Sequence, residues 1–215
     1  PQLGSGLVFP IVEEEILTDP IDIPSHWPRL CGIDFGWDHP TACVWVAWDR
    51  DVDTVYVYDS YSIRQETVPV HSSAIKARGK WIPVIWPQDG RQADKGSGKN
   101  LTEQYKKEGV NMCPEWFTNP PQKGLREGTG GNSVEAGIME MLVRMQTKRL
   151  KIFKNQSKLL EELRMHHRKD GKIVPMNDDL ISALRYCIMS LRKARLKIYE
   201  PLQQFTDSEF NVFAR

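Results

Sequence analysis

The strongest pattern in the chain is a series of short apolar runs near its start. Residues 30–37, 41–49 and 54–62 are rich in β-branched and aromatic side chains, and only short polar tracts separate them. Such side chains favour strands, and such brief connections suit hairpins rather than crossovers. The pattern therefore predicts three consecutive antiparallel strands.

After residue 66 the pattern changes to alternating helices and strands. Helices are predicted over 67–80, 100–109, 133–149, 157–167 and 177–197, and further strands over 81–87, 110–117 and 150–153. Asn100 and Ser133 (or Asn132) are suitable helix caps. An antiparallel three-strand start followed by β-α units predicts an α/β fold with a ribonuclease H-like mixed sheet and flanking helices.

The two ends of the chain differ from its centre. Residues 1–28 are Pro-rich and acidic, which predicts an extended arm or linker, and the opening PQLGSG resembles a cloning remnant. Residues 29–198 form the predicted folded domain. Residues 199–215 lack periodicity and are expected to be disordered or to act as a docking segment. No apolar run reaches the length of a membrane helix.

Charge and cysteine content indicate which partners and which cellular compartment to expect. The net charge is +1, but residues 185–197 carry five basic residues and no acid, and residues 95–107 carry four lysines against one glutamate. Local basic patches attract polyanions even when the whole chain is nearly neutral. The four cysteines form no CxxC or CxxH pair, which argues against a zinc site and favours a reducing, intracellular setting.

Acidic residues stand at three unexpected places. Asp34 lies inside the first apolar run, Asp89 directly follows the run WIPVIWPQ, and Asp178 and Asp179 open the last helix. A carboxylate in a buried strand is costly unless it is paired, hydrogen-bonded or bound to metal. If the strands of Asp34 and Asp89 are neighbours and the last helix packs across them, these acids converge on one edge of the sheet.

Converging carboxylates point to a metal site. They repel one another, and a divalent cation relieves the repulsion. Hard oxygen ligands suit Mg²⁺ or Mn²⁺. Two such ions about 4 Å apart can activate a water and stabilise the leaving oxygen of a phosphodiester. The acids therefore predict phosphodiester hydrolysis.

Each acid also has a structural explanation. Asp34 can accept hydrogen bonds from the following turn, and Asp89 can belong to an Asp-Gly turn. Asp178 and Asp179 suit a helix N-terminus because of the macrodipole. The metal-site hypothesis depends on the constellation rather than on any single member.

Other polar residues are weaker candidates. Asp38 suits turn chemistry, and Asp59 ends the third strand, where it orients a ligand or faces solvent. The adjacent His166 and His167 lack the helical spacing of metal ligands, so solvent or core positions are expected for them.

Four motifs together identify a family. They are GIDFG (32–36) followed by DHPTA (38–42), Asp89 after an apolar strand, Lys123-Gly124 with the helix start SVEAGI (133–138), and NDDLISALRY (177–186). Over residues 30–195 the sequence resembles the nuclease domain of the large terminase subunit of tailed double-stranded DNA phages. The last motif is the most specific of the four.

One position departs from the family pattern. The family's Asp before Ala-Leu-Arg-Tyr is Ser182 here, and the family's His position holds Asp179. These positions share a helix face. The resemblance therefore implies Asp34, Asp89 and Asp179 as catalytic and metal-binding residues, with Asp178 as the alternative third ligand.

The resemblance implies a metal-dependent endonuclease that cuts concatemeric double-stranded DNA during genome packaging, with two Mg²⁺ or Mn²⁺ ions. An N-terminal ATPase domain belongs to the family's parent protein, and no GxxxxGK[ST] motif occurs in this chain. The implied partners are double-stranded DNA, the portal and the small terminase subunit. The implied location is the cytoplasm of the infected host cell, with no membrane partner.

Two basic, glycine-bearing loops, residues 90–99 and 122–132, are expected to flank the site. Their cations suit sequence-independent contacts to DNA phosphate, although a solvated loop explains each of them equally well. The expected contacts are Arg91, Lys95, Lys99, Lys123 and Arg126.

Two alternatives stay open. One is a Holliday-junction-resolvase-like nuclease of the same fold, against which the Ala-Leu-Arg-Tyr helix argues. The other is a DNA-docking or portal-docking module with a weak active site, which Ser182 favours.

Overall fold

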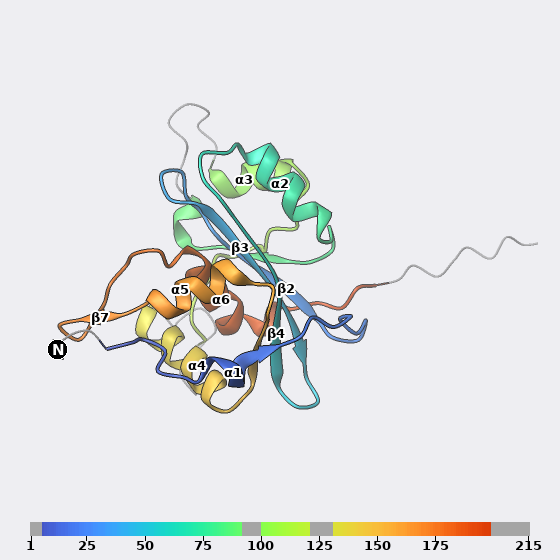
Figure 1. The fold of residues 1–215 in the computed structure, drawn as a ribbon. Helices are drawn as coiled ribbons and strands as arrows, with labels where there is room; N and C mark the ends of the chain where they lie inside the picture. Colours follow the sequence, from blue (N-terminus) through green and yellow to red (C-terminus); the bar gives the residue numbers. More distant parts are fainter. Residues whose placement is uncertain (1–5, 92–99, 121–130, 199–215) are drawn as a thin grey trace, which may run out of the picture.

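The computed structural model describes residues 6–91, 100–120 and 131–198 (Figure 1). Strands β7 (Arg168–Lys169) and β8 (Lys172–Ile173) form a small antiparallel sheet, and a six-stranded mixed sheet forms the centre of the fold. Its strand order is β1-β6-β4-β3-β2-β5. The strands are β1 (Leu17–Thr18), β2 (Arg29–Asp34), β3 (Thr41–Asp49), β4 (Thr54–Ile63), β5 (Val84–Ile85) and β6 (Leu150–Phe153). As predicted, β2, β3 and β4 are antiparallel, while β5 joins β2 and β6 joins β4 in parallel. The predicted ribonuclease H-like α/β class is confirmed.

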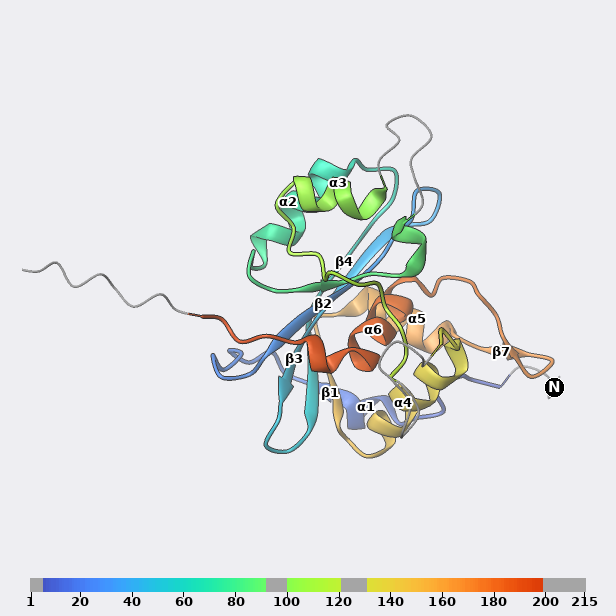
Figure 2. The same ribbon diagram turned by 180° about the vertical axis from the view of Figure 1, so that it is seen from behind.

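Helices cover both faces of this sheet. They are α1 (Glu13–Ile16), α2 (Val68–Ala77), α3 (Leu101–Lys107), α4 (Val134–Gln146), α5 (Ser157–Met165) and α6 (Asp179–Met189), with the short 3-10 helices η1 (Gln88–Arg91) and η2 (Leu191–Lys193). Helices α2 and α3 lie on one side of the central strands and α4, α5 and α6 on the other (Figures 1 and 2). This explains why residues 42–47 of β3 are completely buried on both faces.

The predicted helix caps are present. The Asn100 side chain accepts a hydrogen bond from the Glu103 N–H at 2.8 Å, and the Ser133 hydroxyl accepts one from the Ala136 N–H at 3.4 Å. Both side chains satisfy backbone donors that a helix start would otherwise leave unpaired.

Three predicted elements are clearly shorter than expected or absent. Residues 110–117 form no strand, only a bridge between Met112 and Val84. Their partner β5 has two residues because Pro83 and Pro87, which flank it, have no N–H to donate. The last helix ends at Met189 instead of continuing to residue 197.

Residues 6–28 are integrated into the fold, although an extended arm was expected. Strand β1 pairs in parallel with Ile152 and Phe153 of β6, and Val8, Phe9 and Ile16 are buried in the main core. Burial of these apolar side chains outweighs the extended preference of the nearby prolines. The predicted tail, residues 199–215, lies outside the described residues.

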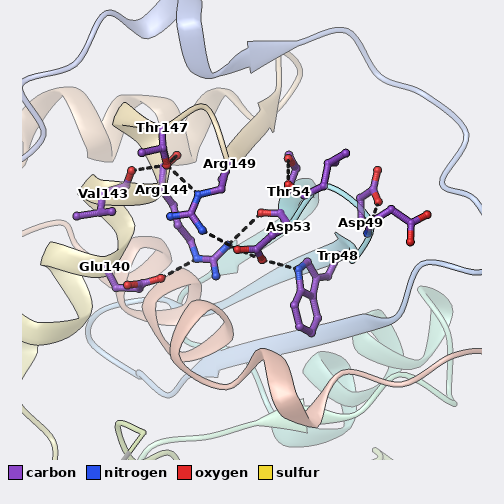
Figure 3. A network of polar contacts seen from close by, with 11 residues as sticks. Trp48, Asp49, Asp53, Thr54, Glu140, Val143, Arg144, Thr147 and Arg149 are labelled. Atoms are coloured by element: carbon purple, nitrogen blue, oxygen red, sulfur yellow. Dashed lines mark hydrogen bonds and ion pairs between the residues drawn. The ribbon is translucent and has the colours of Figure 1, made fainter. Parts of the chain in front are cut away.

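An ion-pair network holds the β3–β4 hairpin against α4. Asp53, a turn residue with φ of +50°, accepts hydrogen bonds from Trp48 at 2.9 Å, Arg144 at 3.2 Å and Arg149 at 2.6 Å (Figure 3). Arg144 also donates to Glu140 at 2.8 Å. These partners lower the pKa of Asp53 despite the opposing effect of desolvation. The network lies at the end of β3 opposite Ala42, which pairs with Asp34.

Gly32 in the middle of β2 allows α6 to lie directly on the sheet. A Cβ atom at this position would overlap the carbonyl oxygen of Ala183 in α6 and lie 2.9 Å from the Cys187 sulfur. Because the obstacle includes helix backbone, the helix can approach so closely only over a residue without a side chain.

Replacing Gly32 with alanine should therefore push α6 away from β2. We expect Gly32→Ala to lower the free energy of unfolding by about 1–3 kcal/mol, the usual cost of overpacking, or by more. Thermal melting measures this, with Gly6→Ala as the control because nothing lies within 4 Å of a Cβ there. Equal melting temperatures for the two variants would contradict the close contact.

Candidate active site

Asp34 and Asp89 lie at the same end of two neighbouring strands. Asp34 is the last residue of β2, and Asp89 lies in η1, four residues after β5 ends at Ile85. Since β2 and β5 are parallel, their carboxyl ends meet at one edge of the sheet. The apolar run containing Asp34 continues to residue 37 in the sequence, but the strand ends at Asp34 itself.

The environment of Asp34 is the most perturbed part of this edge. The pKa of Asp34 is raised to about 7, mainly by burial and also by the nearby charges of Asp89 and Asp179, while a hydrogen bond donated by the Tyr186 hydroxyl at 3.0 Å opposes the shift. Arg185 also favours the charged form. The charges of Asp89 and Asp179 both act on Asp34, and Asp179 lies beside His39 in the loop that follows Asp34.

Asp89 and Asp179 are more open. Asp89 reaches solvent, yet partial desolvation still raises its pKa. Asp179 is the first residue of α6, and its pKa is raised by desolvation and by the charge of Asp178, against the lowering effect of His39. The His39 Nδ1 atom lies 3.6 Å from an Asp179 oxygen. Asp178 is the N-cap residue of α6, but its side chain makes no capping hydrogen bond.

The acids share an edge without forming a closed cluster. In the part of the chain that the structure describes, no group of three or more His, Cys, Asp or Glu side chains is arranged to hold a metal ion. The donor set nevertheless suits a hard divalent cation, because it consists of carboxylates whose pKa values are raised by desolvation, and in Asp34 also by the charges of Asp89 and Asp179. A cation bound here would relieve both effects.

Three polar residues at this edge were not singled out from the sequence. Tyr186 bonds to Asp34, His39 lies beside Asp179, and Glu162 of α5 lies under the start of α6. The burial of Glu162 could have been predicted from the helical spacing. It is three residues after Leu159 and one before Leu163, and both leucines face the core. The contacts of Tyr186 and His39 depend on tertiary packing and had no such signal.

Cavities lie on both sides of the acids. One of about 410 Å³ is lined by Asp89 and by the aromatic side chains of Phe35, Trp37 and Tyr105. The other, of about 470 Å³, is lined by Asp179 and includes the residues Arg64, Lys158, Glu161 and Glu162. Asp89 and Asp179 therefore each border a cavity.

Only one of the five expected DNA-contacting residues can be placed. Arg91 is exposed in η1, two residues after Asp89, with its guanidinium 4.6 Å from the centre of the Trp116 ring. Lys95, Lys99, Lys123 and Arg126 lie outside the described residues.

The weaker candidates have other environments. Asp59 pairs with Arg78 at 2.7 Å, Asp38 is exposed, and His166 is buried with its pKa lowered mainly by desolvation. Ser182 is half-buried, and its N–H donates to the Asp178 carbonyl oxygen at 2.7 Å within the first turn of α6.

The fold and the acidic edge together define a ribonuclease H-like domain of the nuclease type. The family model described as "Terminase RNaseH-like domain" matches residues 31–191, and the chain belongs to this family. Among proteins similar to it, the large terminase subunit of Salmonella phage P22 is 40% identical over 197 residues. These residues make up 91% of this chain but 38% of the P22 protein.

Solved structures agree with this assignment. The P22 large terminase nuclease domain superposes with a TM-score of 0.80 at 40% identity, over 90% of this chain and 96% of that one. The large terminase nuclease domain of bacteriophage SPP1, solved with bound Mn, superposes with a TM-score of 0.55 at 14% identity, over 82% of this chain and 97% of that one. The SPP1 similarity is one of fold.

The raised pKa of Asp34 makes stability depend on pH. Its pKa is about 7 in the folded chain and near 3.8 when unfolded, so the folded state holds the proton more tightly and loses this stabilisation as pH rises from about 4 through 7. Without metal, Asp34→Asn should therefore have a higher melting temperature than the parent chain at pH 8. The increase should be about 2–4 °C for each kcal/mol by which the substitution raises the free energy of unfolding.

Thermal melting in EDTA at pH 5 and pH 8 tests this expectation. The difference between Asp34→Asn and the parent chain should shrink at pH 5, and exposed Asp38→Asn should show no comparable change. A difference that is the same at both pH values would mean that the Asp34 charge is not destabilising.

Proposed function

We propose that this chain is the metal-dependent endonuclease domain of a phage large terminase and that it cuts concatemeric double-stranded DNA during genome packaging. The observation that carries the proposal is the placement of Asp34, Asp89 and Asp179 at one accessible edge, where desolvation raises the pKa of each carboxyl group. Strongly perturbed acids in an open site are typical of catalytic centres.

The proposed ligands are Asp34, Asp89 and Asp179, with Asp178 as the alternative third ligand, for two Mg²⁺ or Mn²⁺ ions. When bound, such ions supply Lewis acidity that activates water and stabilises the leaving oxygen of a phosphodiester. The absence of a closed ligand cluster among the described residues supports a weak site that DNA phosphates complete.

The surrounding residues hold the carboxylates in place. Tyr186 donates to one oxygen of Asp34, which favours the ionised form and limits the movement of this carboxylate. Strand β2 and helix α6 are packed elements rather than loops, so they limit the movement of Asp34 and Asp179. Arg91, which is exposed two residues after Asp89, is a proposed contact to a DNA phosphate, as are Lys95, Lys99, Lys123 and Arg126.

We also propose which proteins and domains this nuclease domain works with. The chain corresponds to 38% of the P22 protein, so an ATPase domain in the same parent chain, the portal and the small terminase subunit are partners inferred from the family. We place the activity in the cytoplasm of the infected host cell. No helix in the described part of the chain is long and apolar enough to cross a membrane.

Plasmid cleavage tests the function directly. The chain should nick or linearise plasmid with Mn²⁺ or Mg²⁺ and not in EDTA. Asp34→Ala and Asp179→Ala should each lower the rate at least about 100-fold, because metal-assisted charge stabilisation contributes several kcal/mol.

Asp51→Ala is the matched control, since Asp51 is exposed in the β3–β4 turn at the opposite end of the sheet. An equal loss of cleavage rate in Asp51→Ala would mean that the substitutions act through a general loss of folding rather than through the acidic edge. If no metal supports cleavage by the parent chain while DNA binding persists, the docking-module alternative replaces the nuclease proposal.

A further inference from the structure

Glu162 is a buried carboxylate that the proposed mechanism does not use. It lies on α5 among core leucines, and only 9% of its surface is exposed. Its Oε2 atom accepts hydrogen bonds from the Leu180 N–H at 2.9 Å and the Ile181 N–H at 3.1 Å. One side chain of α5 therefore satisfies two backbone donors in the first turn of α6.

Helix α6 has no side-chain cap of its own. Its N-cap residue is Asp178, whose carboxylate makes no capping hydrogen bond. A local cap would satisfy the backbone but would leave the helix free to move against its neighbours. Glu162 instead ties the start of α6 to α5, while Gly32 fixes the middle of α6 on β2.

This connection lies directly beneath a proposed metal ligand. Asp179 immediately precedes Leu180, and Glu162 and Asp179 line the same cavity of about 470 Å³. Placing a carboxylate so close to Asp178 and Asp179 is electrostatically unfavourable, whereas a leucine would suit the apolar surroundings but would leave the Leu180 and Ile181 N–H groups unpaired. A costly side chain in this place indicates a role beyond filling the core.

We propose that Glu162 is a positioning residue: by holding the first turn of α6, it fixes Asp179 relative to Asp34, and the affinity of the edge for divalent cations depends on it. This inference rests on the proposed function, because Asp179 is a ligand only within that proposal. Hydrogen-bonded residues behind metal ligands typically change affinity or activity 10- to 100-fold when they are removed.

The test compares Glu162→Ala with Glu162→Gln and Glu161→Ala. Alanine leaves the Leu180 and Ile181 N–H groups unpaired, and the Mn²⁺ concentration for half-maximal plasmid cleavage should rise about 10- to 100-fold. Glutamine keeps an acceptor oxygen of the same reach and should restore the response to within a few-fold. Glu161 is exposed on the same helix and lines the same cavity, so its replacement should change little.

Calorimetric titration of Mn²⁺ separates this inference from the proposed function. If the parent chain binds Mn²⁺ but does not cut DNA, the nuclease proposal fails, and weaker Mn²⁺ binding by Glu162→Ala still supports the positioning role. If the parent chain cuts DNA and the Mn²⁺ response of Glu162→Ala is unchanged, the nuclease stands and the positioning role is overturned, even if the variant melts at a lower temperature. A parent chain that neither cuts DNA nor binds Mn²⁺ overturns both.

Should Glu162→Ala fail to fold, Glu162→Asp takes its place. The shorter side chain keeps the charge but cannot reach both N–H groups, so the Mn²⁺ requirement should still rise by about 10-fold. A normal Mn²⁺ response in a folded Glu162→Asp variant would overturn the proposal.

Discussion

The contact between α6 and Gly32 of β2 determines where the acids lie. The helix backbone rests on the strand with no side chain between them. Two residues beyond Gly32 the strand ends at Asp34, and the same helix begins at Asp179. Because two packed elements meet at backbone distance, the two carboxylates are held near each other by the core itself. The flanking loops are not needed to bring them together.

This arrangement creates an electrostatic conflict that the fold only partly resolves. Asp34 is pushed toward its neutral form by burial and by its acidic neighbours, and Tyr186 and Arg185 act in the opposite direction. Burial likewise raises the pKa of Glu162 to about 8, although two backbone N–H groups favour its charged form. Proteins accept such losses of stability at sites that bind ligands.

Local patterns predicted the parts of this structure that depend on local forces. The three antiparallel strands follow from their apolar runs, the caps at Asn100 and Ser133 from short-range hydrogen bonding, and the strand-end positions of Asp34 and Asp89 from the interruption of apolar runs. The shared edge then followed from the order of the elements.

Long-range contacts were less accessible to prediction. Glu162 contacts helix α6, which begins 17 residues later in the sequence, at Asp179. Its hydrogen-bond partners are backbone N–H groups, which every residue except proline has, so the side-chain sequence does not reveal them. The first strand, β1, pairs with residues far along the chain, so a segment rich in proline and acid looked like an arm. The apolar composition of residues 81–87 predicted a strand over the whole run, but the flanking prolines limit β5 to two residues.

Strand β1 also protects the sheet from self-association. It covers the outer edge of β6, whose other side pairs with β4. A shortened chain beginning at Arg29 would leave the backbone groups of β6 unpaired and would uncover the core surface beneath Val8, Phe9 and Ile16. An open strand edge next to exposed apolar surface is a template for intermolecular pairing. The boundary that the composition suggests at residue 28 would thus yield an aggregation-prone fragment, and the smallest well-behaved unit includes the N-terminal segment.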